Sequence, residues 1–222
     1  MLPWITLDTA EIPGGGETLR LKQRGTEFSI MLGANELMNS RLYGSEEALA
    51  TLSLDKLTGR PKPKVLIGGL GMGFTLRAAL GRLGPEAKVE VAELVPEVVD
   101  WARGPMAALH QGALDDPRVT ITLGDVGAVI SGGKAYDAIL LDVDNGPDGL
   151  SRTANDALYN ARGLGLAKAA LTKGGVLAVW SSGRDPGFTR RLTQAGFQTE
   201  EKIVRATGKS GAKHMIWLAV KP

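Results

Sequence analysis

A glycine-rich stretch near residue 70 is the segment whose residue types could most directly hold a cofactor. It follows an apolar run at 65–67, precedes a helix-like segment that begins at Phe74, and reads Gly68-Gly69-Leu70-Gly71-Met72-Gly73. Positions without side chains let a ligand lie against the backbone, and a helix that starts there offers free N–H groups. A G-x-G-x-x-G loop for pyrophosphate would need glycine at position 74. The observed spacing therefore favours a cofactor of the S-adenosylmethionine type, with a ligand-free tight turn as the alternative.

Carboxylates follow the next two strand-like runs. Glu93 lies 20 positions after Gly73, where a carboxylate can accept hydrogen bonds from both ribose hydroxyls of a nucleoside; an ordinary exposed glutamate is the alternative. Asp125 follows the third run and can receive an adenine amino group, cap the next helix, or do both. Because open α/β sheets bind ligands at the carboxyl ends of their strands, these residues and the glycine loop predict one cofactor site.

The fourth strand-like run ends in an acidic loop that could take part in proton transfer. Asp142, Asp144 and Asp148 fall within seven positions, so they would attract a cationic amine and raise one another's pKa values. Alkyl transfer from a sulfonium needs a positioned nucleophile that has lost its proton. We predict Asp142 as the base or orienting carboxylate and Asp144 as its acidic companion; a solvated acidic loop is the alternative.

Three aromatic residues are candidates for an acceptor pocket, because aromatic faces suit cationic groups: Tyr43, Tyr159 and Trp180. Each of them fits a core position as well. The chain has two histidines and no cysteine, so we expect no metal site, no iron–sulfur cluster and no thiol catalysis.

The order of the expected elements indicates how these residues come together. Strand-like runs at 18–22 and 27–32, followed by a helical segment at 45–57, predict a short β-rich N-terminal part over residues 1–60. From residue 61 onward strands and helices alternate, which implies a parallel sheet covered on both faces. The expected strands are 65–67, 88–92, 119–123, 137–141 and 176–180, and a long helix is expected over 155–171, ended by Gly174-Gly175. Two last runs, 197–205 and 214–220, have no helix between them and predict an antiparallel hairpin at one edge.

These elements predict an α/β fold, a Rossmann-like methyltransferase three-layer sandwich with a mostly parallel seven-stranded sheet. Residues 61–222 would form the S-adenosylmethionine-binding domain. Composition agrees, since 43% of the residues are hydrophobic and 23% are charged. A net charge of +2 gives no strong attraction to nucleic acid, and neither a membrane span nor a signal peptide is recognisable. We expect a cytoplasmic protein that acts on a small molecule, without nucleic-acid or membrane partners.

From about Leu32 to Val179 the chain resembles the spermidine-synthase-like family within the class I S-adenosylmethionine-dependent methyltransferase superfamily. The matching segments are 65–73, 89–93, 116–125 and 136–142, with shorter matches at 43–47, 158–159 and 171–177. The resemblance implies a homodimer and a cofactor, either S-adenosylmethionine or its decarboxylated form, held by the glycine loop. It also implies Asp142 as the group that deprotonates an attacking amine.

Departures from the family bear on the choice of cofactor. Where its aminopropyltransferases carry an aspartate in the loop G-G-G-D-G-G, placed to hold the amine of the decarboxylated cofactor, this chain has Gly71. The catalytic D-S-S-D-P loop reads Asp142-Val143-Asp144-Asn145-Gly146-Pro147 here, and Trp180 stands where the family has a glutamine. Loss of the loop aspartate removes the countercharge for a lone ammonium, whereas full S-adenosylmethionine carries a carboxylate that suits free N–H groups.

Three functions follow as expectations. The first is an S-adenosylmethionine-dependent methyltransferase acting on a small amine. The alternatives are a polyamine aminopropyltransferase (spermidine synthase) that uses decarboxylated S-adenosylmethionine, and a cofactor-binding protein that has lost catalysis.

Overall fold

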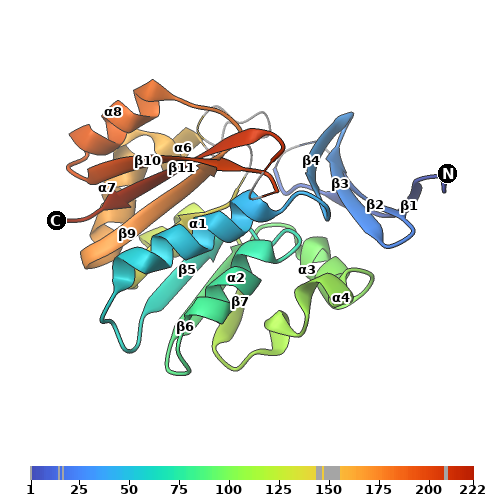
Figure 1. The fold of residues 1–222 in the computed structure, drawn as a ribbon, viewed down its shortest axis with the longest axis horizontal. Coiled ribbons are helices and arrows are strands. Elements are labelled where there is room, and N and C mark those ends of the chain that lie inside the picture. Colours follow the sequence, from blue (N-terminus) through green and yellow to red (C-terminus); the bar gives the residue numbers. More distant parts are fainter. Residues whose placement is uncertain (1, 15, 17, 144–146, 148–155, 208–209) are drawn as a thin grey trace.

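Two β-sheets and the helices that cover the larger one make up the protein (Figure 1). The computed structural model describes residues 2–14, 16, 18–143, 147, 156–207 and 210–222. A four-stranded antiparallel sheet precedes a seven-stranded sheet along the chain, and the two lie beside each other in Figure 1.

The larger sheet confirms the predicted architecture. Its strand order is β10-β11-β9-β8-β5-β6-β7, and β11 runs in the direction opposite to that of the other six strands. The strands are β5 (Lys64–Gly68), β6 (Lys88–Glu93), β7 (Val119–Leu123), β8 (Tyr136–Leu141), β9 (Leu171–Ser181), β10 (Gln198–Arg205) and β11 (Lys213–Val220). The central strand β8 is buried along almost its whole length, as a parallel strand covered on both faces must be.

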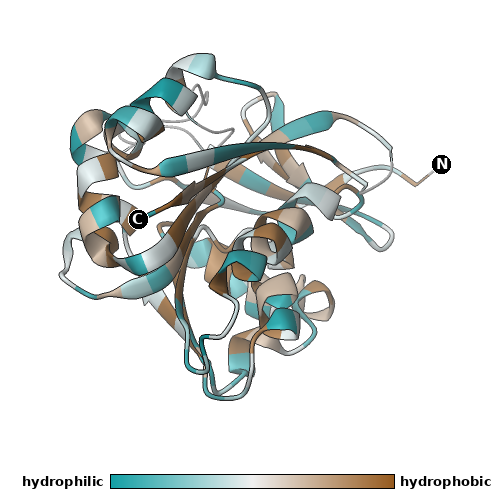
Figure 2. Ribbon diagram, turned by 60° about the vertical axis from the view of Figure 1, so that its left-hand side comes forward, coloured by the Kyte–Doolittle hydropathy of each residue, from teal (hydrophilic) through white to brown (hydrophobic). Residues whose placement is uncertain are grey.

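Helices lie on both faces of this sheet and produce three layers. Each face has its own apolar core, and in Figure 2 hydrophobic residues dominate the central strands between the helices. One face carries α1 (Gly44–Leu54), α2 (Phe74–Arg82), α3 (Pro96–Arg103) and α4 (Ala107–His110), with the short 3₁₀ helices η1 (Asp55–Leu57) and η2 (Ala113–Asp115). The other face carries α5 (Val126–Ser131), α6 (Asp156–Tyr159), α7 (Ala161–Ala170) and α8 (Pro186–Gln194).

The N-terminal sheet contains two strands that the sequence pattern did not reveal. Its order is β1-β2-β3-β4, with β1 (Ile5–Glu11), β2 (Thr18–Arg24), β3 (Glu27–Leu32) and β4 (Asn35–Asn39). The runs at 18–22 and 27–32 were predicted. β1 and β4 are edge strands with a single buried residue between them, Ala10, so neither shows the alternation of buried and exposed residues that marks a strand.

The helix predicted over 155–171 differs from the structure in its described part. Asn160 interrupts it by capping α7, and its Oδ1 accepts a hydrogen bond from the N–H of Gly163 at 2.9 Å. The helix ends at Ala170, and Gly174-Gly175 lies inside β9 rather than ending the helix. The N–H of Gly174 bonds to the carbonyl of Lys221, which ties the extended start of β9 to the C-terminus.

Helix α1 packs on the larger sheet beside α2, although it precedes the predicted boundary at residue 61 (Figure 1). This position brings the first turn of α1 close to the segment that follows the glycine loop. In the described part of the chain, no helix combines the length and apolar character that crossing a bilayer requires.

Candidate active site

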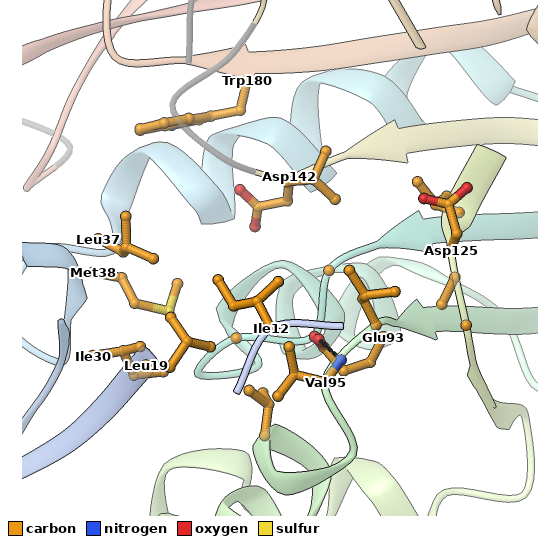
Figure 3. Close-up of a pocket in the computed structure, with 18 of the residues that line it drawn as sticks. Ile12, Leu19, Ile30, Leu37, Met38, Glu93, Val95, Asp125, Asp142 and Trp180 are labelled. Carbon is orange, nitrogen blue, oxygen red and sulfur yellow. Dashed lines mark hydrogen bonds between the residues drawn. The ribbon is translucent and has the colours of Figure 1, made fainter. Parts of the chain in front are cut away.

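A cavity opens at the carboxyl ends of the parallel strands, against the N-terminal sheet (Figure 3). Its apolar wall comes from residues of the N-terminal part, namely Ile12, Leu19, Ile30, Leu37 and Met38. Its polar wall comes from the glycine loop, from residues at the ends of β6, β7 and β8, and from Glu46 in the first turn of α1. The larger sheet thus supplies most of the polar groups, and the smaller sheet encloses them.

Four carboxylates line this cavity: Glu46, Glu93, Asp125 and Asp142. Among its described lining residues there is no Lys and no Arg. Three of the four were predicted as site residues, and the structure brings them together as the strand order requires.

Two of the predicted loop glycines, Gly69 and Gly71, line the cavity. Both have positive φ angles, +88° and +49°, in the region that favours glycine. A Cβ atom on Gly69 would lie 2.5 Å from the backbone oxygen of Asp142, so the loop passes directly against the end of β8.

The other two loop glycines have packing roles. A Cβ atom on Gly68 would lie 2.9 Å from Cγ2 of Val126, at the contact between β5 and α5. Gly73 caps α2 with a φ angle of +77°, and the ring of His110 packs against it. Neither lines the cavity, so packing explains these glycines without a ligand.

Glu93 fastens the glycine loop to the end of β6. Its Oε2 accepts a hydrogen bond from the N–H of Leu70 at 2.8 Å, and its Oε1 accepts one from the N–H of Val95 at 2.9 Å. Burial raises the pKa of Glu93, and these backbone donors oppose the rise. Glu93 faces the cavity, and its role toward a ribose stays a prediction.

Asp125 caps helix α5, one of the two roles predicted for it. Its Oδ1 accepts a hydrogen bond from the N–H of Ala128 at 3.0 Å. The side chain also lines the cavity beyond the end of β7 (Figure 3). The cap therefore leaves open the second predicted role, toward an adenine amino group.

Asp142 follows β8 and has a carboxylate neighbour that the sequence did not reveal. Thr75, in the first turn of α2, donates a hydrogen bond to Asp142 Oδ2 at 2.6 Å, and its hydroxyl lies 3.3 Å from the carbonyl oxygen of Glu46. Glu46 is only 7% exposed, and the hydroxyl of Ser45 donates to its Oε2 at 2.6 Å. α1, α2 and β8 therefore meet at a pair of carboxylates.

The pKa values of both members of this pair, Glu46 and Asp142, are raised. Burial, with the negative charge of Asp142 as the next cause, raises the pKa of Glu46 to about 7. Burial also raises the pKa of Asp142 to about 6, although the hydrogen bond from Thr75 opposes the rise. Both carboxylates would be more easily ionised if a cation lay beside them.

Two of the predicted aromatic residues lie near this pair. Trp180 lines the cavity (Figure 3). Its ring meets that of His214 edge to face, with ring centroids 4.8 Å apart. Tyr43 precedes α1 and stacks on Phe74 with ring centroids 4.5 Å apart, but it is not part of the cavity wall.

The remaining predicted residues are not brought to the cavity. Tyr159 is buried in the core on the opposite face of the sheet, edge to face with Phe188. Asp144 lies outside the described residues.

Glu46 and Thr75 are the site residues that sequence reasoning missed. A glutamate in the first turn of a helix is usually explained by its favourable interaction with the helix dipole, so Glu46 does not stand out in the sequence. A signal was nevertheless present, because Glu46 is three and four residues before the buried Leu49 and Ala50 and so shares their apolar face. The helix dipole does not explain why an acidic residue lies on the apolar face of a helix, so such a residue is a candidate for a functional role.

Substitution Glu46→Gln is expected to raise the melting temperature more at pH 8 than at pH 5. A glutamate in the unfolded chain ionises near pH 4, whereas Glu46 in the folded protein ionises at a pH of about 7. The folded state therefore holds this proton more tightly, and the stability that the proton contributes below pH 4 is lost as the pH rises through 7. A relief of about 2 kcal/mol corresponds to about 4–8 °C in a chain of this length. Thermal melts of both proteins at the two pH values measure the difference.

Burial lowers the pKa values of the two histidines, so their contribution to the free energy of unfolding changes with pH in the direction opposite to that of Glu46. This contribution is the same in variant and wild type, and it cancels when the two are compared. Glu47→Gln, one residue along the same helix and outside the cavity wall, is the control and should raise the melting temperature at pH 8 less than Glu46→Gln does. An equal change at both pH values for Glu46→Gln would contradict the raised pKa of Glu46.

No protein-family model matches this sequence. Among curated proteins, the chain is similar to polyamine aminopropyltransferase 1 of Hyperthermus butylicus, with 36% identity over 132 residues, which cover 57% of this chain and 44% of the relative. It is also similar to the polyamine aminopropyltransferase of Corynebacterium efficiens, with 30% identity over 165 residues, which cover 72% of this chain and 30% of the relative. The match thus spans less than half the length of either relative.

Solved structures agree on the fold. The spermidine synthase from Thermotoga maritima superposes with a TM-score of 0.77 at 21% identity, covering 98% of this chain and 73% of that one. A spermidine synthase in complex with the transition-state analogue AdoDATO gives a TM-score of 0.75 at 20% identity, covering 98% of this chain and 72% of that one. The seven-stranded sheet and the N-terminal antiparallel sheet are both part of this shared fold.

The expectation of a methyltransferase is wrong, because the sequence relatives are aminopropyltransferases. The glycine at position 71 removes one carboxylate, but Glu46 gives the same cavity another, so the change at Gly71 does not favour full S-adenosylmethionine. The sequence relatives and structural neighbours of this chain are polyamine aminopropyltransferases and spermidine synthases, and its resemblance to the spermidine-synthase-like family of the class I S-adenosylmethionine-dependent methyltransferase fold is confirmed.

Proposed function

We propose that this chain transfers an aminopropyl group from decarboxylated S-adenosylmethionine to a small polyamine-type amine. The observation that carries the proposal is the charge of the cavity, whose described lining has four carboxylates and neither Lys nor Arg. The donor and the acceptor are both cations, which an acidic cavity favours. The carboxylate of full S-adenosylmethionine would meet like charges there.

The described residues fit such a donor. Gly69 and Gly71 carry no side chains of their own and line the cavity. Glu93 and Asp125 also line it, and they would accept hydrogen bonds from the ribose hydroxyls and the adenine amino group, respectively. When bound, the donor supplies a sulfonium whose neighbouring aminopropyl carbon is open to attack by an amine. The apolar wall from the N-terminal sheet would exclude water from that reaction.

Asp142 would remove the proton of the acceptor. An amine nitrogen can attack only when its lone pair is free, so the proton it carries must pass to a nearby base. The raised pKa of Asp142, about 6, brings the carboxylate nearer to the proton affinity that a base needs at neutral pH. Thr75 keeps this carboxylate in place through its hydrogen bond to Oδ2.

Product analysis tests the proposal directly. Purified protein incubated with decarboxylated S-adenosylmethionine and a panel of diamines should release 5′-methylthioadenosine together with an amine lengthened by one aminopropyl unit. Mass spectrometry detects both products. Formation of neither product with any diamine of the panel would reject the proposed function.

The homodimer and the cytoplasmic location expected from the sequence stay predictions. Light scattering of the purified protein tests the first, and fractionation of cells tests the second.

A further inference from the structure

The glycine loop has no acidic side chain where a donor with a free ammonium would need one. Gly71 lines the cavity, and a Cβ atom on it would lie 2.8 Å from both Sδ and Cε of Met38. The thioether of Met38 therefore occupies the space that a side chain at position 71 would take. The loop side of the cavity is apolar at this point, and it offers an ammonium no countercharge.

Glu46 supplies a carboxylate to this cavity from a different element. It belongs to the first turn of α1, and this turn lies beside the segment that leaves the glycine loop. Tyr43, just before α1, stacks on Phe74, the first residue of α2, and Thr75 contacts the carbonyl oxygen of Glu46. The carboxylate thus lies at the exit of the glycine loop although it is distant in sequence.

The carboxylate of Glu46 is held by neutral partners. The hydroxyl of Ser45 donates to Oε2 at 2.6 Å, and Nδ1 of His214 lies 2.8 Å from that hydroxyl. His214 is in turn covered by Trp180. The charged groups that act on Glu46 are Asp142 and, more weakly, Glu47, and both are acidic. Among the groups that the structure describes, only like charges act on this buried carboxylate, so it is suited to receive a cation from outside.

We propose that Glu46 binds the terminal ammonium of the aminopropyl donor and so replaces the missing carboxylate of the glycine loop. The assignment rests on the proposed function. An ammonium has three N–H donors, so it can bond to Glu46 while the nucleoside part of the donor stays on the glycine loop. Recognition of the decarboxylated donor in this chain then depends on helix α1.

Calorimetric titration of two ligands separates this role from a structural one. Decarboxylated S-adenosylmethionine carries the ammonium, whereas 5′-methylthioadenosine shares its nucleoside and lacks the aminopropyl group. Glu46→Gln should weaken binding of the donor by about 10- to 100-fold, the range expected for loss of a hydrogen bond to a charged group. Binding of 5′-methylthioadenosine should be unchanged, and Glu46→Asp should recover part of the donor affinity.

Glu47→Gln is the matched control, because it removes the neighbouring charge of the same helix without touching the cavity wall. Equal losses for both ligands in Glu46→Gln would overturn the assignment, and so would an unchanged donor affinity, which would place Glu46 at the acceptor. A wild-type protein that binds the donor no better than 5′-methylthioadenosine would also overturn it. Selective donor binding through Glu46 without any polyamine product would support the assignment and reject the proposed function.

Discussion

Asp142→Asn should lower kcat for aminopropyl transfer by about 10²- to 10⁴-fold, the usual contribution of a positioned general base. The amide has almost the same shape and can still accept the hydrogen bond from Thr75, which is now made to Asp142 Oδ2. It cannot take a proton from the acceptor. Single-turnover measurements at saturating donor and acceptor isolate this step from binding.

The same variant should bind the donor nearly as well as the wild type does, because the ammonium is assigned to Glu46. Asp100→Asn, an exposed position on α3, serves as the control and should leave kcat unchanged. In the wild type, kcat/KM should rise with pH through the pKa of Asp142 in the ligand-free protein, about 6, because kcat/KM reports ionisation of the free enzyme. A fully active Asp142→Asn protein would remove Asp142 from the role of base.

Gly69→Ala should destabilise the protein strongly and abolish donor binding. The added Cβ atom would lie 2.5 Å from the backbone oxygen of Asp142, which cannot move without shifting the end of β8. The φ angle of +88° adds strain of about 1–2 kcal/mol for a residue with a side chain, and overpacking adds about 1–3 kcal/mol. A total near 3 kcal/mol would lower the melting temperature by about 6–12 °C.

Gly133→Ala separates the two causes. Gly133 has a similar φ angle of +78°, but a Cβ atom there would meet nothing within 4 Å. The melting temperature of Gly133→Ala should fall only by the amount that backbone strain explains, and this variant should bind the donor as well as the wild type does. Equal melting temperatures for the two variants would show that the contact with Asp142 contributes nothing.

Most of the larger sheet could be predicted because its signals are local. β8 ends in a continuous apolar run, and a glycine or a carboxylate lies at or directly after the end of β5, β6, β7 and β8. Parallel strands bring their carboxyl ends to one edge of the sheet, so the sequence alone predicts that Glu93, Asp125 and Asp142 lie in one site.

The missed parts depend on contacts between elements distant in the sequence. The carboxylate of Glu46 gains its meaning only from the approach of α1 to α2 and β8, which no local pattern records. The apolar wall of the cavity likewise comes from a sheet whose edge strands have almost no buried residues. Without Glu46, the missing aspartate at Gly71 points to full S-adenosylmethionine, and so to transfer of a methyl group instead of an aminopropyl group.

The contact between Ser45 and His214 links the first helix to the last strand. A chain emerging from the ribosome presents α1 well before β11, and a domain generally folds as a unit. The hydroxyl of Ser45 therefore gains its partner His214 only when β11 has joined β9. The support of Glu46 thus depends on completion of the larger sheet, and not on the segment around α1 alone.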